Sequence, residues 1–244
     1  MKEGNKLEEK LTDEQKAEVQ KILLLPIVCS KRYKSIEIQD NVIYSGQEFY
    51  TSPDEDMSDI AIVFYEILYA NALNGKKILS GKDLANCCFA GDTMNSFNTI
   101  LNMLKKKELS DEEEALLEKY QKHYHCLANF WILPSCIGRR SRKGNNLDSM
   151  DIFLNGIDED YDGVMKKHLS YYKAWSNVSD FRKEHYLSGY KNKKTESIRK
   201  SYADKDGKSI INEAIERIKQ RAKDISDSDK GKELWEYFQS HKWI

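Results

Sequence analysis

Apolar residues recur every three or four positions along much of this chain, which is the spacing of a helix that packs one face against a core. Residues 12–24 carry the first such stripe behind a capping box formed by Thr12 and Gln15, and Pro26 stops the helix. Further helices are predicted over residues 93–107, 110–127, 148–154, 162–175, 179–187, 208–224 and 229–240. The pattern therefore indicates a mainly α fold.

One predicted helix, residues 53–73, has almost no polar face. Its start is indicated by Ser52 as the N-cap, Pro53 at the first helical position and Glu55 two residues later, and the Asn74–Gly75 pair is a typical stop. A helix that is apolar nearly all round is buried. We therefore expect this segment to be the central helix of the core.

Alternation of apolar and polar residues, the pattern of a strand, is confined to short stretches. Residues 35–38 and 42–44 flank the polar run 39–41, which predicts a short hairpin. Residues 129–133 predict a short strand, and Pro134 closes it. The predicted class is thus mainly α (α+β), with many helices, one short hairpin and one short strand. The strand lies within residues 120–154, the segment that contains most of the candidate functional residues.

The composition fits a folded protein. With 244 residues, 40% of them hydrophobic and 11% aromatic, the chain can bury a substantial core. No linker rich in Pro, Gly or Ser divides it, so we expect one compact domain over 1–244, with residues 1–11 flexible and 188–208 exposed.

The charge balance and the cysteines bear on location and partners. Lys and Arg number 39 against 40 Asp and Glu, so the net charge of −1 does not predict a nucleic-acid or membrane partner, and any such partner would be bound by a local patch. The N-terminus is charged, no run approaches 18 apolar residues, and the cysteine count of five is odd. We expect a soluble cytoplasmic protein with reduced thiols and no membrane partner.

Histidine, cysteine and basic side chains, which can take part in catalysis or binding, are concentrated in residues 120–154. His123 and His125 are two residues apart, about 200° around a helix axis, so their rings would diverge on a helix and could share a metal only if the segment were extended. His123 lies on the border of the apolar face of the predicted helix and is interpreted as structural or polar. His125 points away from that face and is the candidate catalytic residue. Cys126 cannot converge with its neighbour His125 on a helix and is interpreted as buried.

Two further groups of polar residues flank this region. Asp92 is predicted to cap the helix over residues 93–107, and Asn95 begins a row of asparagines on that helix, either a binding feature or a solvated face. Downstream of the strand, four cations lie within five positions and are candidate phosphate ligands: Arg139, Arg140, Arg142 and Lys143. The alternatives are that this loop is merely solvated, or that Arg139 pairs with a buried carboxylate such as Asp92.

Two short segments of the sequence resemble segments of known protein families. The segment Gly91–Phe97 (GDTMNSF) and the segment His125–Pro134 (HCLANFWILP) with Gly138 and Arg139 after it resemble a family of uncharacterised bacterial proteins. The second string also resembles the HNH-type endonuclease domain at the C-terminus of GmrSD-like restriction enzymes. That resemblance implies a ββα nuclease site with a divalent metal, although no metal ligands can be assigned.

The sequence departs from the HNH pattern at three places. Ala128 stands where the family has glycine, and Arg139 stands where it often has asparagine. The Glu-His-Ile string with the catalytic histidine is missing. A degenerate member is therefore implied.

Two functions remain open on the sequence. In the first, the protein binds or processes nucleic acid, as a hydrolase if it is an enzyme, with the basic loop on phosphates and four residues near the chemistry: His125, Asp92, Asn95 and Asn129. In the second, it is a non-enzymatic interaction or inhibitor protein, for example in phage–host conflict. Convergence of the polar residues and Arg139 in one cleft would favour the first.

Overall fold

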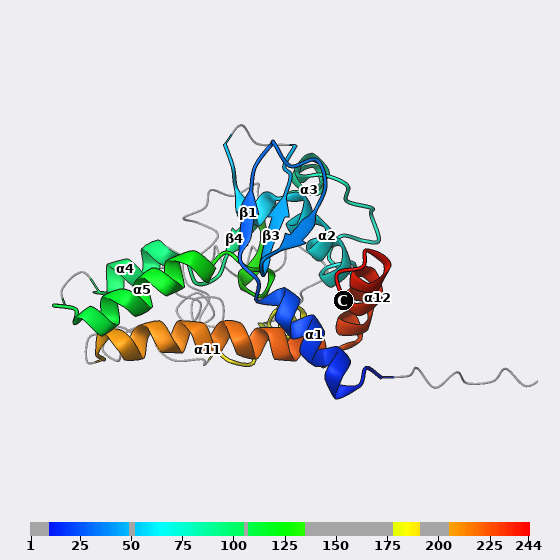
Figure 1. Ribbon diagram of the computed structural model, residues 1–244. Coiled ribbons are helices and arrows are strands. Elements are labelled where there is room, and N and C mark those ends of the chain that lie inside the picture. The colour runs from blue at the N-terminus through cyan, green and yellow to red at the C-terminus, as the bar shows by residue number, and fades with distance from the viewer. Residues whose placement is uncertain (1–9, 49–51, 105–106, 135–177, 191–204) are drawn as a thin grey trace, which may run out of the picture.

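The computed structural model describes residues 10–48, 52–104, 107–134, 178–190 and 205–244. Within these ranges helices dominate, and the strands form one three-stranded and one two-stranded sheet (Figure 1). The predicted class, mainly α with a little β, is confirmed. The predicted helices over residues 148–154 and 162–175 lie outside the described residues, as does the loop that contains Arg139, Arg140, Arg142 and Lys143.

The longest described helix, α11 (Gly207–Ser226), begins where the Asp206 side chain accepts a hydrogen bond from the backbone N–H of Ser209. It packs against α1 (Asp13–Leu23) and α12 (Asp229–Ser240) (Figure 1). The sequence predicted all three helices, and the bounds of α12 agree with the prediction. In α1 the capping box is present, because Thr12 Oγ1 accepts from Gln15 N and Gln15 Oε1 accepts from Thr12 N. The predicted helix over residues 179–187 also forms, but as α9 (Val178–Glu184) it ends three residues earlier than predicted.

The predicted central helix is central, but it begins later than expected. The helix α2 (Asp59–Leu68) follows a short 3₁₀ turn, η1 (Glu55–Met57), and Ser58 rather than Ser52 occupies its N-cap position. The chain at Asp54 instead donates its N–H to the side chain of Gln47. That contact, between residues seven positions apart, competes with the local capping signal at Ser52, and the predicted start of the helix was wrong.

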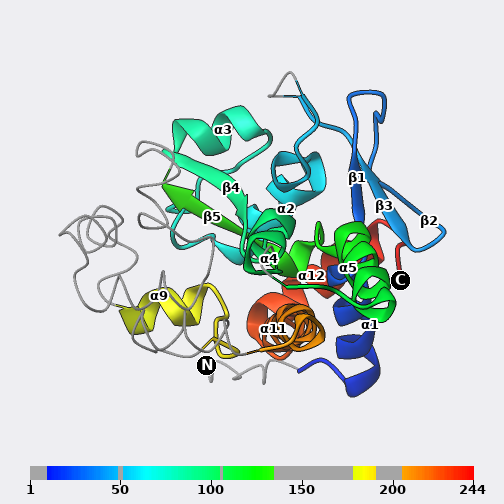
Figure 2. The same ribbon diagram turned by 90° about the vertical axis from the view of Figure 1, so that its left-hand side faces the viewer.

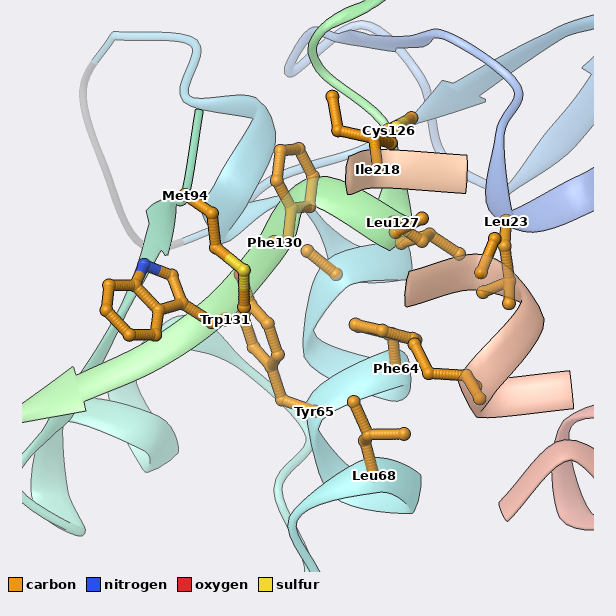
Figure 3. Close-up of a cluster of buried hydrophobic side chains, with 14 of the residues drawn as sticks. Leu23, Phe64, Tyr65, Leu68, Met94, Cys126, Leu127, Phe130, Trp131 and Ile218 are labelled. Atoms are coloured by element: carbon orange, nitrogen blue, oxygen red, sulfur yellow. The ribbon is translucent and has the colours of Figure 1, made fainter. Parts of the chain in front are cut away.

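Side chains from four elements, including α2 itself, form this part of the core. Phe64 and Leu68 of α2 are buried with Leu23 of α1, Phe130 of the strand β5 (Phe130–Pro134) and Ile218 of α11 (Figure 3). The helix ends at Leu68, and turns continue to Asn74 and Gly75, whose backbones have positive φ. None of the helices in the described ranges combines the length and the apolar content that crossing a bilayer requires.

The predicted hairpin is confirmed, and a third strand joins it. Strands β2 (Glu37–Gln39) and β3 (Val42–Ser45) are antiparallel, and positive φ at Asp40 and Asn41 makes the tight turn that suits the twist of a hairpin. The unpredicted strand β1 (Ile27–Cys29) pairs in parallel with β3. Its three residues are too few to show alternation, and its partner lies 16 positions further along the chain.

The two-stranded sheet contains the main error of the sequence-based assignment. β5 was predicted, but its antiparallel partner β4 (Phe89–Thr93) includes Asp92, which was predicted to cap a helix. The helix α4 (Phe97–Leu104) begins later, where Ser96 Oγ accepts from Thr99 N. Pairing with a strand about forty residues away decided this segment, and no local pattern reports such pairing.

The helix before β5 is shorter than predicted. The capping box of Ser110 and Glu113 is present, but α5 (Asp111–His123) ends four residues before the expected residue, Leu127. A 3₁₀ turn, η2 (Leu127–Asn129), then leads into β5. His125 therefore lies outside the helix, in the connection to the sheet.

Candidate functional site

His125 is held between elements that are distant in sequence. Its backbone carbonyl accepts a hydrogen bond from Ile27 N at 2.8 Å, so β1 fixes the connection that follows α5. Its ring centroid lies 3.9 Å from that of Tyr124 and 6.1 Å from that of Phe130. The side chain is 29% exposed. This partial exposure leaves the imidazole accessible while its surroundings restrict its orientation.

Glu55, from η1, is the partner of His125. Glu55 Oε2 lies 3.2 Å from His125 Nδ1, and the Glu55 side chain is 24% exposed. Burial raises the pKa of Glu55, but the hydrogen bond and the charge of His125, with backbone N–H groups, outweigh burial and hold this pKa below its usual range. A carboxylate that binds one imidazole nitrogen orients the ring and stabilises its charged form, so the other nitrogen can exchange a proton.

Sequence reasoning missed Glu55, because the residue was interpreted only as part of a helix start. It lies 70 positions before His125, and no motif joins the two. His123, by contrast, lies on α5 with its Nδ1 2.7 Å from the carbonyl of Lys119 and its side chain exposed. The structural or polar interpretation of His123 therefore agrees with its position.

Asn95 and Asn129, two of the predicted catalytic residues, meet directly. Asn129 Oδ1 accepts from the backbone N of Asn95 at 3.0 Å and from its Nδ2 at 3.1 Å, and Asn129 Nδ2 donates to Asn95 O at 3.1 Å and to Tyr124 O at 2.8 Å. Tyr120 OH also donates to Asn95 O, and Asn95 Nδ2 donates to Tyr190 OH. The two amides thus join the GDTMNSF segment to the HCLANF segment.

This network has a structural consequence for the site. Both donors and the acceptor of the Asn129 amide are satisfied by protein groups, and the side chain is fully buried. The network places the backbone next to His125 rather than presenting an amide to solvent. Tyr190, which completes it, lies in the range predicted to be exposed, yet it is buried.

Asp92 lies on the other face of the small sheet. Residues directly opposite in an antiparallel pair share a face, and successive residues alternate. Thr93 pairs with Phe130, which contacts His125, whereas Asp92 pairs with Trp131, which contacts Phe181 and His185 near α9. The carboxyl group of Asp92, whose Oδ1 accepts from Thr93 N, is therefore separated from His125 by the sheet.

On the His125 face, η1 approaches the sheet very closely. Thr93 Oγ1 donates to the buried carboxylate of Asp56 at 3.2 Å, and a Cβ added to Gly91 would lie 2.0 Å from the Asp56 carbonyl oxygen. Only glycine leaves room for that approach. The single glycine of the GDTMNSF segment, Gly91, thus allows η1, and with it Glu55, to reach the sheet.

Cysteine chemistry and metal binding find little support in the described part of the chain. Burial raises the pKa of Cys126 to about 12 and that of Cys29 to about 11, so both thiols stay protonated near neutral pH. Cys87 and Cys88 are partly buried. Among the described residues no group of three or more His, Cys, Asp or Glu side chains is arranged to hold a metal ion.

The structure thus brings together Asn95, Asn129 and the connection that carries His125, adds Glu55, and leaves Asp92 on the opposite face. Comparisons with known proteins identify no family for this chain, because no family model, no curated protein and no solved structure matches it.

Proposed function

We propose that the protein binds and processes nucleic acid, with His125 and Glu55 as its acid–base pair. The observation that carries the proposal is the 3.2 Å contact between a partly exposed imidazole and a carboxylate of lowered pKa. The order of the chain adds support, since β5 leads from this site into the basic residues around Arg139 and Arg140. A phosphodiester is the substrate group that would use both a base and a set of cations.

In the proposed reaction, His125 accepts the proton of the attacking hydroxyl at the ring nitrogen not bound to Glu55 while that oxygen bonds to phosphorus. The bond from phosphorus to the leaving sugar oxygen breaks, and the imidazolium returns the proton to that oxygen. Glu55 stabilises the resulting imidazolium and keeps the ring oriented. The arginines of the loop neutralise the phosphate oxygens, and Arg can do so through two parallel hydrogen bonds. A divalent metal is implied only by the HNH resemblance. The described residues near His125 offer fewer than three grouped ligands, so no step here depends on a metal.

Cleavage assays with single-stranded DNA, duplex DNA and RNA test the chemistry, each with and without Mg²⁺ or Mn²⁺. We expect His125→Ala to lower the rate by about 10²–10⁴, the usual contribution of a general base. Glu55→Gln should also slow the reaction while leaving substrate binding intact. His123→Ala is the matched control, because it removes a neighbouring exposed imidazole and should keep full activity. Cleavage that survives His125→Ala would assign the chemistry to other residues.

Salt-dependent binding tests the role of the loop. If Arg139 and Arg140 bind phosphates, changing both to Ala should flatten the slope of log affinity against log salt by about 1.4–1.8. Lys76→Ala with Lys77→Ala removes two exposed charges elsewhere and should leave the slope unchanged. An unchanged slope in the arginine variant, together with a large loss of stability, would instead indicate pairing with a buried carboxylate. Absence of binding by the unaltered protein would favour the non-enzymatic interaction role.

A further inference from the structure

A groove between α5 and α11 lies apart from the residues of the proposed acid–base pair. The two helices lie side by side, with α1 against the C-terminal half of α11 (Figures 1 and 2). Apolar side chains from α5, α11, the C-cap residue of α1 and the connection after α5 line a cavity of about 330 Å³: Leu24, Leu116, Tyr120, Cys126, Ile215 and Ile218. This volume falls within the range of small-molecule sites, about 300–1,000 Å³.

The rim of the groove carries a net positive charge. Lys119, His123 and Lys219 line it with a single acidic residue, Glu216. Glu216 already accepts from Lys219 Nζ at 2.8 Å. Within the described ranges no carboxylate pairs with the ammonium group of Lys119, which is exposed at the mouth. The groove therefore combines an apolar wall with a cation that an anionic head group could bind.

The dimensions of the groove fit a small molecule with a short apolar chain. The lining on α5 runs from Leu116 to His123, which corresponds to about 10 Å along the helix. A short aliphatic chain with one charged end fits both the length and the charge.

We propose that this groove binds a small amphipathic carboxylate, with its apolar chain between α5 and α11 and its head group on Lys119. This proposal is independent of the acid–base pair of His125 and Glu55. It identifies a ligand class, a monocarboxylate with an aliphatic body, from the lining and the rim alone.

Titration calorimetry of the full chain with octanoate tests the proposal, with octylammonium as a probe of the same length and opposite charge. We expect saturable binding of octanoate and no binding of octylammonium. Lys119→Glu should weaken octanoate binding by about tenfold or more, because a charge-assisted contact is replaced by repulsion. Lys122→Glu, on the same helix but outside the groove, is the control and should change the affinity by less than about twofold.

A second pair of variants tests the location. Leu116→Trp should fill the groove and abolish binding, whereas Ala115→Trp on the exposed side of α5 should not. Circular dichroism shows that each variant is folded before its binding is compared. Equal binding of both probes, binding unaffected by Lys119→Glu, or octanoate binding only at micelle-forming concentrations would each overturn the proposal. A dimer in sedimentation velocity that Leu116→Trp dissociates would identify a second copy of the chain as the occupant.

Discussion

Asn129 shows how one side chain can join segments that are far apart. Its amide bonds both the N–H and the C=O of Asn95, 34 positions earlier, and the carbonyl of Tyr124. All these groups are buried or partly buried, so each would lose free energy if left without a partner. The amide at this position is therefore required by the fold, whatever it adds to catalysis.

Replacing Asn129 by Leu should lower the free energy of unfolding by about 2–4 kcal/mol, because several buried backbone groups lose their partner at once. Denaturant unfolding measures the loss. Asn98→Leu is the control, since Asn98 is exposed on α4 and its replacement should cost less than about 0.5 kcal/mol. A loss below about 1 kcal/mol for Asn129→Leu would contradict the structural role of the network.

A second prediction at the residue scale concerns His185, whose ring stacks on that of Phe181 with centroids 4.0 Å apart. Burial lowers the pKa of His185 to about 3. Between pH 6.5 and pH 3 the unfolded chain therefore binds a proton that the folded chain does not. Stability should fall as pH drops through this window, by about 1.4 kcal/mol per pH unit from this group.

Unfolding free energies measured between pH 7 and pH 5 test this dependence. In this range most carboxyl groups remain ionised, so the histidines dominate the change. His185→Gln cannot take up the proton and should have a flatter profile than the unaltered protein. His123→Gln is the control and should keep the steeper profile. Parallel profiles for the protein and His185→Gln would show that His185 is not buried in its neutral form.

At the scale of elements, α2 organises the core and the small sheet closes it. The helix carries buried side chains on most of its circumference, and it packs against η1, α3 (Gly81–Asn86), β5 and, from the C-terminal end of the chain, α12. Tyr65 at its middle donates to Asp56 O and so connects α2 to η1. Packing around α2 should therefore dominate stability.

Phe64→Ala should cost about 3–5 kcal/mol, because the side chain is fully buried and its loss leaves a cavity. Chemical denaturation of the variant tests the value. Val63→Ala, a change at the adjacent and only partly buried position, should cost less than about 1.5 kcal/mol. A cost below about 1 kcal/mol for Phe64→Ala would mean that α2 is not the centre of the core.

At the scale of the whole molecule, Arg221 on α11 connects distant parts of the chain. Arg221 is 2% exposed, and its guanidinium donates to Ala128 O at 2.8 Å, to His185 O at 2.8 Å and to Tyr69 OH at 3.1 Å. It thereby holds the turn before β5, the end of α9 and the turn after α2 against one helix. Sequence reasoning placed Arg221 only within a predicted helix.

Arg221→Met should destabilise the protein by about 2–4 kcal/mol, since it leaves buried carbonyl groups without donors, a loss only partly offset by removing a buried charge. Thermal and denaturant unfolding provide the measurement. Lys219→Met, two positions earlier on α11, removes an exposed ion pair with Glu216 and should cost about 1 kcal/mol or less. Equal or greater stability of Arg221→Met would show that burying this cation costs as much as its hydrogen bonds contribute.

Within the candidate site, the sequence singled out Asn95 because asparagine is a poor helix former, and His125 because it lies off the apolar face of the predicted helix. Asn129 was singled out through the HNH resemblance. It could not identify Glu55, which reaches His125 only through the position of η1. It also could not place Asp92 on the far face of the sheet, since that depends on pairing between Asp92 and Trp131. The roles of the basic residues from Arg139 to Lys143 stay a prediction.

By itself, the sequence determined the features that depend on neighbours within about four residues. The capping boxes of α1 and α5, the hairpin turn at Asp40 and Asn41, and the amphipathic period of α11 and α12 are of this kind. Tertiary structure decided whether residues 89–93 form a strand, where α2 begins, and which carboxylate meets His125. These depend on contacts between residues seven to about seventy positions apart, which outweigh local preferences and leave no periodic trace in the sequence.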